Sequence, residues 1–149
     1  MADQLVGRIS GIALRGPDRG PMHEVREVRA HPNGGLENDV KSSLERGLTL
    51  LAARQWEQVV SELGVELPWH TRRANILIET DGLGHLIGRK LRVGEAEMEV
   101  LAETKPCAQM ETLHKGLRAA LAGDCRGGVH GQITRGGLIR TGDAVSLHE

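Results

Sequence analysis

The stretch Lys90–Cys107, KLRVGEAEMEVLAETKPC, carries the clearest structural signal in the chain. Apolar and polar residues alternate along Lys90–Val93 and again along Ala96–Leu101, which is the period of a strand with one buried face. Between them, Gly94-Glu95 matches a two-residue turn that begins with glycine, so the two segments are predicted to form a β-hairpin. Pro106 then ends the second strand, because proline has no N–H to donate to a sheet.

Cys107 follows this proline and precedes a predicted helix, Ala108–Ala122, with apolar residues spaced along one face. The cysteine therefore falls at or just before the first helical turn. Unpaired N–H groups and the helix dipole favour a thiolate there, and Lys105 adds a positive charge. We predict that Cys107 is reactive. The alternative, a small and inert apolar residue, is common among cysteines and stays open on this local chemistry.

Short strands separated by turn residues account for most of the remaining chain. A helix is predicted to begin with Thr49 as its cap and to end at Gly64. The other predicted strands are Leu5–Leu14, Met22–Val28, Asn75–Thr80, Val129–Thr134, Leu138–Arg140 and Ala144–Leu147. Two further hairpins are predicted, one of Leu5–Leu14 with Met22–Val28 and one of Val129–Thr134 with Leu138–Arg140. Strands at this spacing, without a repeated βαβ alternation, predict a mainly β chain with two or so helices that plug or cover a small barrel.

Composition places the chain in a broad class. Its 149 residues suit a single domain, 1–149, that buries roughly two-thirds of the unfolded surface. The 19 Lys and Arg nearly balance 20 Asp and Glu, which argues against a nucleic-acid partner. We find no signal peptide and no apolar run long enough to span a bilayer. Two distant cysteines are typical of free thiols in a reducing compartment, so we expect a cytoplasmic protein without a membrane partner.

Two polar segments are candidate binding elements. The glycine-rich loop Gly34–Asp39, followed by Arg46, could bring backbone N–H groups and charged side chains to an anion; a solvated surface loop is the alternative. Arg73 and Asn75 enter a predicted strand two residues apart, so the alternation sends both to one side of the sheet. An arginine and an amide together suit a phosphate and the edge of a heterocycle, and a solvated strand entrance is the alternative here.

Cys125 and His130, five residues apart, raise the possibility of a zinc site. Structural zinc needs four ligands, and the chain has no Cys-x-x-Cys or His-x₃-His pair. We therefore expect no zinc. The paired glycines Gly127-Gly128 between these residues indicate a close approach of backbone to backbone or to a ligand.

Several of these segments, taken together and in order, resemble the MOSC domain, named for the C-terminal domain of molybdenum cofactor sulfurases. The matching segments are Gly35–Asp39, Arg46–Leu50, Arg73–Asn75, Leu86–Gly94, Thr104–Cys107 and Gly142–Val145. They run from about residue 35 to the end of the chain. The Lys-Pro-Cys element between a strand and a helix is the most specific of them.

The resemblance implies a distorted, closed β-barrel related to the barrel of pyruvate kinase. It also implies a molybdenum cofactor, a molybdopterin, with Cys107 as the catalytic residue that carries sulfur as a persulfide or ligates molybdenum. By the same resemblance, the candidate pterin and phosphate contacts are Arg73, Asn75, Lys105, Asp39 and Arg46. Family members include sulfur-transfer proteins and reductases of N-hydroxylated compounds.

Our leading hypothesis is therefore a cofactor-binding protein that acts through Cys107 in sulfur transfer or in a reduction. A soft thiolate suits both roles. The chain shows no pyridoxal-phosphate desulfurase domain and no iron–sulfur domain, so we expect a sulfur-donor protein or an electron-donor protein as partner. The alternative from another class is a non-catalytic module that binds the cofactor or a protein through the same barrel.

Overall fold

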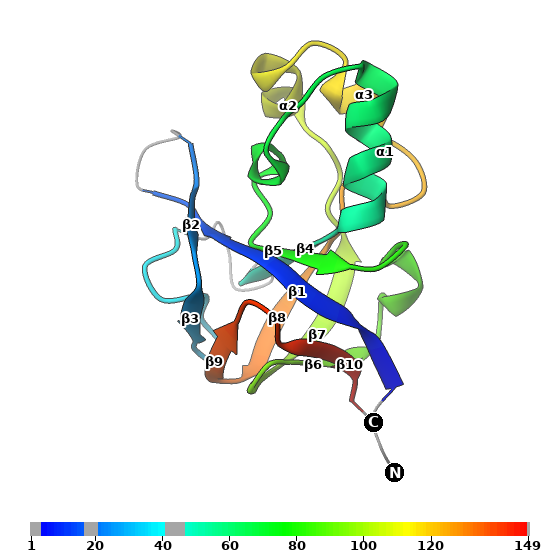
Figure 1. Cartoon of the computed structure of the whole chain (residues 1–149). Coiled ribbons are helices and arrows are strands. Elements are labelled where there is room, and N and C mark those ends of the chain that lie inside the picture. The colour runs from blue at the N-terminus through cyan, green and yellow to red at the C-terminus, as the bar shows by residue number, and fades with distance from the viewer. Residues whose placement is uncertain (1–3, 17–20, 41–46, 149) are drawn as a thin grey trace.

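A computed structural model of the chain describes residues 4–16, 21–40 and 47–148. Its strands are β1 (Gln4–Leu14), β2 (His23–Val25), β3 (Glu27–Ala30), β4 (Leu48–Ala52), β5 (Ile76–Glu79), β6 (Lys90–Val93), β7 (Ala96–Glu103), β8 (Val129–Arg135), β9 (Gly137–Arg140) and β10 (Ala144–Leu147). The α-helices are α1 (Ala53–Leu63), α2 (Ala108–Leu113) and α3 (Leu117–Leu121), and two single 3₁₀ turns are η2 (Trp69–Arg72) and η3 (Gly84–Leu86). Figure 1 shows the three α-helices gathered at one end of the strands.

Within the described residues, seven strands close into a barrel in the order β1-β10-β6-β7-β8-β4-β5 and back to β1. The predicted hairpin of Lys90–Val93 with Ala96–Leu101 is confirmed, since β6 pairs with β7 from Lys90 opposite Glu99 to Val93 opposite Ala96. Strand β2 extends the β1 edge outside the closed ring, and β3 and β9 form a separate two-stranded sheet. The prediction of a mainly β, distorted closed barrel is confirmed.

Strand β1 belongs to more than one part of this architecture because it bends. Its first half pairs with β10, and its second half pairs with β2 on one edge and β5 on the other. Its pairing is irregular between Leu5 and Gly7 and between Ile9 and Gly11, and such bulges bend a strand and increase its twist. At Gly7, a Cβ would lie only 2.3 Å from the Glu79 carbonyl oxygen, so this bend requires glycine.

The segment Leu48–Ala52 is a strand, which corrects the prediction that Thr49 caps a helix. All five residues are buried, on both faces, because β4 lies between β8 and β5 with α1 covering its outside. A strand buried on both faces shows no alternation, and its apolar run can be mistaken for the start of a helix. The helix begins at Ala53 and ends, as predicted, at Gly64, whose φ is 68°. Strands β4 and β5 pair in parallel, with α1 as the crossover.

Three smaller expectations are also wrong. The segment Met22–Val28 is divided at Arg26 into β2 and β3, which belong to different sheets. The predicted hairpin of Val129–Thr134 with Leu138–Arg140 does not form, because β9 pairs with β3 and not with β8. A Cβ on Gly137 would lie 2.7 Å from the Glu95 carbonyl oxygen, so glycine lets β9 pass close to the β6–β7 turn. The predicted helix Ala108–Ala122 is broken into α2 and α3, because Gly116 adopts a φ of 88° and begins a new helix.

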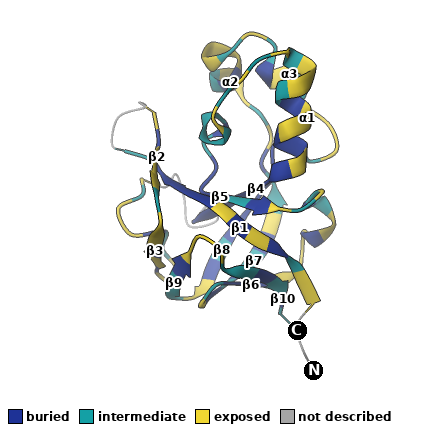
Figure 2. Cartoon of the chain, viewed as in Figure 1, coloured by how far each residue is buried: buried dark blue, intermediate teal, exposed yellow. Residues whose placement is uncertain are grey.

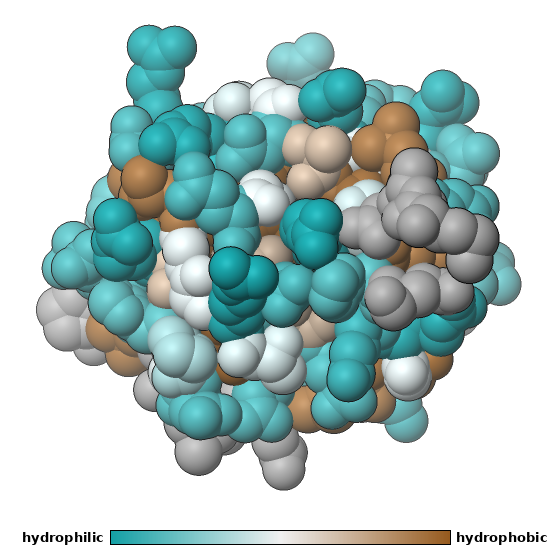
Figure 3. All heavy atoms as spheres, turned by 90° about the horizontal axis from the view of Figure 1, so that it is seen from below, coloured by the Kyte–Doolittle hydropathy of each residue, from teal (hydrophilic) through white to brown (hydrophobic). Residues whose placement is uncertain are grey.

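Two apolar clusters form the interior. Figure 2 shows buried residues along the strands and on one side of α1. The larger cluster fills the barrel and includes Met98 and Val100, which point inward as the alternation predicted. The smaller lies between the helices and the outside of the barrel, and includes Leu51, Trp56 and Met110. The face opposite the helices carries mainly hydrophilic side chains (Figure 3). In the described part of the chain, no helix is long and apolar enough to cross a membrane.

The barrel core provides the first testable prediction. Val100 is fully buried, so Val100→Ala removes inward methyl groups and should lower the free energy of unfolding by about 1–3 kcal/mol. The neighbouring Leu101 faces outward, and Leu101→Ala should change stability much less. Urea unfolding of both variants checks this. If Leu101→Ala were the more destabilising change, the facing of β7 would be wrong.

Candidate functional site

Cys107 lies on the short loop that joins β7 to α2. The residue is exposed, and its backbone is extended, with φ −118° and ψ 179°, immediately before the helix begins. Its carbonyl oxygen accepts a hydrogen bond from the Met110 N–H at 3.0 Å, which closes the first turn of α2. The prediction that Cys107 precedes the first helical turn is confirmed, and its sulfur is on the surface where a second molecule can reach it.

Arg72 fixes the base of this loop. Its guanidinium is 5% exposed and donates from Nη2 to the Thr104 carbonyl oxygen (2.8 Å) and from Nε to the Gly127 carbonyl oxygen (3.0 Å). A third contact joins Nη1 to the sulfur of Met110 on α2, at 3.6 Å. A buried cation needs such partners, because leaving its donors unpaired costs several kcal/mol. Arg72 thus ties the end of β7 to α2 and to the Gly127–Gly128 loop before β8. Sequence reasoning missed this role.

Arg73, the arginine that sequence reasoning singled out, is not part of a strand. It follows η2 in a left-handed conformation with φ 67°, and its N–H bonds to the His70 carbonyl oxygen. Strand β5 begins only at Ile76. The expectation that alternation sends Arg73 and Asn75 to one face is therefore wrong, since alternation applies only to consecutive extended residues. Arg73 is half-buried and lies one residue beyond the arginine that holds the Cys107 loop.

Asn75 is completely buried, and its amide is fully engaged by protein groups. Its Oδ1 accepts from the backbone N–H (3.1 Å) and hydroxyl (2.9 Å) of Thr49, and its Nδ2 donates to the Ala13 carbonyl oxygen and to Asp39, both at 3.2 Å. These four bonds use both donors and both acceptor positions of the side chain. Asn75 thus joins the ends of β1, β4 and β5, and a direct contact to a cofactor would require one of these bonds to be exchanged.

Asp39, at the end of the predicted glycine loop, has a fully buried side chain that pairs with Arg15. Its Oδ2 lies 2.9 Å from Arg15 Nη2, and its Oδ1 accepts from the Arg15 backbone N–H at 2.7 Å and from Nε at 3.3 Å. The loop is thereby anchored to the end of β1. Arg46, the remaining candidate contact, lies outside the described residues.

His130 is a further buried polar residue that sequence reasoning considered only as a zinc ligand. It is 8% exposed, and its Nδ1 is hydrogen-bonded to the Thr104 hydroxyl at 3.1 Å. In the sheet it pairs with Thr49 of β4 on one side and Ala102 of β7 on the other. Directly opposed residues in neighbouring strands point to the same face, so His130 and Thr49 are side by side.

These side chains form one line across the end of the barrel, which we call the polar row. Its members are Arg15, Asp39, Asn75, Thr49, His130 and Thr104. A row of buried polar groups is costly unless each is hydrogen-bonded. The row lies on the outer face of the strands, since Leu48 and Leu50 on either side of Thr49 point into the apolar barrel interior. The row ends at Thr104, three residues before Cys107, so it marks this end of the barrel as the candidate site.

A hollow of about 750 Å³ lies beside the Cys107 loop. Lys105 is exposed and lines it together with Pro106, while Cys125 lines it from the segment after α3. Burial raises the pKa of the Cys125 thiol, and the nearby charges of Glu103 and Asp124 raise it further. The two cysteines thus differ: Cys107 is exposed, and Cys125 is half-buried among carboxylates.

The side chains show no ready-made metal site. Across residues 4–16, 21–40 and 47–148, no three His, Cys, Asp or Glu side chains come together in a way that could hold a metal ion. The expectation of no zinc at Cys125 and His130 stays a prediction. The paired glycines between them behave as expected, because a Cβ on Gly127 would lie 2.4 Å from the Thr104 carbonyl oxygen.

The loop, the cysteine and the barrel end can now be compared with known proteins. A family model for the MOSC domain matches residues 37–146. The chain belongs to the MOSC domain family. This family is associated with molybdenum cofactor binding, and the match covers the segments on which the resemblance was based from Glu37 onward, including the Cys107 loop. No curated protein matches this MOSC chain.

Solved structures agree with the MOSC assignment at the level of the fold. The YuaD protein from Bacillus subtilis superposes with a TM-score of 0.81 at 15% identity, covering 96% of each chain. YiiM from Escherichia coli gives a TM-score of 0.76 at 15% identity, covering 95% of this chain and 70% of its own. YiiM from Geobacillus stearothermophilus gives 0.73 at 15% identity, covering 99% and 76%. At such identities the likeness shows a shared fold alone.

The difference between the cysteines of this MOSC domain predicts their labelling. Cys107 should react with iodoacetamide at neutral pH several times faster than Cys125, because Cys125 is half-buried and its raised pKa keeps it protonated. Labelling of Cys125 should rise only at a higher pH than that of an ordinary thiol. Peptide mass spectrometry across a pH series measures both rates. Equal rates with the same pH profile would contradict the prediction.

The Arg15–Asp39 pair predicts a stability difference within the same MOSC domain. Asp39→Ala leaves the largely buried Arg15 guanidinium and one N–H of the Asn75 amide without their acceptor, and should lower the free energy of unfolding by about 3–5 kcal/mol. Asp81 pairs with Arg54 at 3.8 Å on the surface, so Asp81→Ala is the matched control and should be nearly silent. Chemical denaturation compares them. Equal effects would show that the polar row does not hold the barrel end.

Proposed function

We propose that this MOSC protein binds a molybdopterin-type cofactor beside Cys107 and uses the Cys107 sulfur in sulfur transfer or in the reduction of N-hydroxylated compounds. The observation that carries the proposal is the exposed cysteine on a loop whose base is held by the buried Arg72. A fixed backbone with an accessible sulfur suits a residue that must meet another molecule in a defined geometry.

The chemistry of the neighbouring side chains fits such a cofactor. A molybdopterin brings its own dithiolene sulfurs and a phosphate, so it needs from the protein one soft ligand and positive charge. Cys107 would supply the soft ligand. Lys105, two residues before the cysteine, and Arg73, next to Arg72, would supply positive charge for the phosphate. When bound, the cofactor supplies a thiophilic metal that exchanges electrons. The residues of the chain position it and hold the phosphate.

In the sulfur-transfer branch, the Cys107 thiolate attacks the outer sulfur of a persulfide on a donor protein. A new bond forms between Cys107 Sγ and that sulfur, the sulfur–sulfur bond of the donor breaks, and the donor cysteine leaves as a thiolate. No net oxidation occurs, and Cys107 then carries the persulfide. The exposure of Cys107 supports this branch, because the donor must bring its own cysteine to within bonding distance.

In the reduction branch, a donor protein would supply two electrons and solvent two protons, so that the N–OH bond of the substrate breaks, an N–H forms and the oxygen leaves as water. Cys107 would hold the molybdenum as a ligand. Both branches therefore imply a protein partner. Both also require a compartment that keeps cysteines reduced, which is why the proposal places the protein in the cytoplasm.

The proposal is tested on protein purified without reductant, by elemental analysis for molybdenum and by intact mass. We expect wild type and Cys125→Ser to carry molybdenum, or to be one sulfur atom heavier than the bare chain, and Cys107→Ser to lose both signals while remaining folded. Cys125→Ser is the matched control, since it removes a thiol that lines the neighbouring hollow.

Equal loss of the molybdenum and extra-sulfur signals in Cys107→Ser and Cys125→Ser would contradict a specific role for Cys107. Molybdenum that stays bound in Cys107→Ser, together with no reaction that depends on the cysteine, would favour the non-catalytic binding module instead. Absence of both signals from wild type, even after incubation with molybdopterin, would overturn the proposal.

A further inference from the structure

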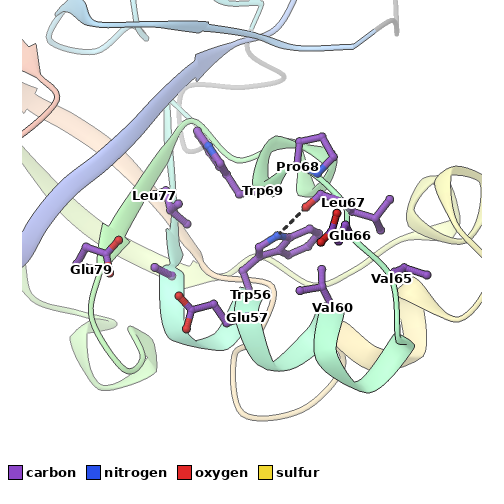
Figure 4. Close-up of a pocket in the computed structure, with 11 residues that line it drawn as sticks. Trp56, Glu57, Val60, Val65, Glu66, Leu67, Pro68, Trp69, Leu77 and Glu79 are labelled. Carbon is purple, nitrogen blue, oxygen red and sulfur yellow. Dashed lines mark hydrogen bonds between the residues drawn. The ribbon is translucent and has the colours of Figure 1, made fainter.

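A second hollow, of about 510 Å³, lies outside the barrel between α1, the segment that follows it and β5. We call it the Trp groove and define it by Trp56, Trp69, Leu77, Glu57, Glu66 and Glu79 (Figure 4). None of its lining residues lines the hollow beside the Cys107 loop. It is therefore a separate place, and nothing in the proposed function uses it.

The charged side chains that line the Trp groove are all acidic, and all three are exposed. Glu57, Glu66 and Glu79 line it, and its lining contains no Lys, Arg or His. Arg8 lies opposite Glu79 in the β1–β5 pairing, but its Nη1 donates to the Gly142 carbonyl oxygen. In the part of the chain that the structure describes, none of these three carboxylates takes part in an ion pair or a side-chain hydrogen bond. Three exposed carboxylates at one hollow produce a negative potential, which attracts a cation and repels an anion.

The two indoles line the groove with apolar ring atoms and no free polar group; Trp56 is only 5% exposed, so the half-buried Trp69 is the more accessible ring. Trp56 Nε1 donates to the Leu67 carbonyl oxygen at 3.2 Å, and Trp69 Nε1 donates to Glu24 at 2.9 Å. These bonds use the only donor of each ring and hold both rings in place. A Cβ on Gly11 would lie 2.9 Å from the Trp69 ring, so β1 also confines that indole. Ring faces attract cations, and they do so best in tryptophan.

We propose that the Trp groove is a binding site for a small organic cation, a protonated amine with an apolar body. The carboxylates recognise the charge, and the indoles with Leu77 receive the apolar part. The size of the hollow falls within the roughly 300–1,000 Å³ typical of small-molecule sites. The carboxylates disfavour an anion, and a neutral apolar molecule would gain no attraction from them.

The chain is well suited to a direct test, because both of its tryptophans line this groove and it contains no Tyr and no Phe. Intrinsic fluorescence therefore reports on the groove alone. The wild-type protein is titrated with three molecules of matching shape: 2-phenylethylammonium, 2-phenylethanol and phenylacetate. We expect a saturable change with the ammonium, a Kd at least about fivefold lower than that for the alcohol, and no binding of the carboxylate.

A variant with Glu57→Gln, Glu66→Gln and Glu79→Gln should bind the ammonium no better than wild type binds the alcohol. A second variant with Glu27→Gln, Glu37→Gln and Glu99→Gln changes the net charge equally at residues outside the groove, and should bind the ammonium like wild type. The comparison of the three ligands on wild type stands even if a triple variant fails to fold.

Several outcomes would overturn the proposal. These are equal affinity for the ammonium and the alcohol, full affinity in the Glu57, Glu66 and Glu79 variant, or no saturable change with any of the three ligands. A change seen only with a lysine-rich peptide would also overturn it, because the groove would then be a surface for a basic protein.

Discussion

The Arg72 guanidinium is the contact on which the candidate site depends. It is buried where the barrel meets the helices, and its contacts go to the end of β7, to the glycine loop before β8 and to α2. A buried charge is expensive unless its donors are paired, so these elements are held together by the same requirement. The loop that carries Cys107 begins at Thr104 and leads into α2, which contains Met110, and Arg72 contacts both residues. The loop is therefore held at both ends.

The Gly127–Gly128 loop can reach Arg72 only because both of its residues lack a side chain. A Cβ on Gly127 would lie 2.4 Å from the Thr104 carbonyl oxygen, and one on Gly128 would lie 2.0 Å from that of Leu50. Gly128 also adopts a φ of 89°, which side chains disfavour. The pair thus lets the chain pass between β7 and β4 and enter β8, which places His130 between Thr49 and Ala102. The polar row follows from that placement.

Sequence reasoning succeeded where the physical signal is local. Alternation gave the β6–β7 hairpin, and Pro106 gave the position of Cys107 before α2. It failed where burial depends on distant strands. Leu48–Ala52 is buried on both faces only because β8, β5 and α1 surround it, and it therefore lacks the alternation of an ordinary strand. The burial of His130 also depends on which strands β8 meets, and no spacing within the sequence encodes this.

The sequence pattern predicted Arg73 as the arginine of the site, whereas its neighbour Arg72 contacts the Cys107 loop. The 3₁₀ turn η2 and the left-handed Arg73 rotate the chain just before β5, so the arginine that reaches the Cys107 loop is Arg72. This turn lies at the end of the crossover that the parallel strands β4 and β5 need, since a parallel pair requires the chain to return along the barrel. The crossover consists of α1 and η2. Trp69, the first residue of η2, lies in the Trp groove, and Arg72, the last, holds the Cys107 loop. A single four-residue turn thereby positions one side chain in the Trp groove and another, buried, beneath the Cys107 loop, so a change in this turn would affect both places.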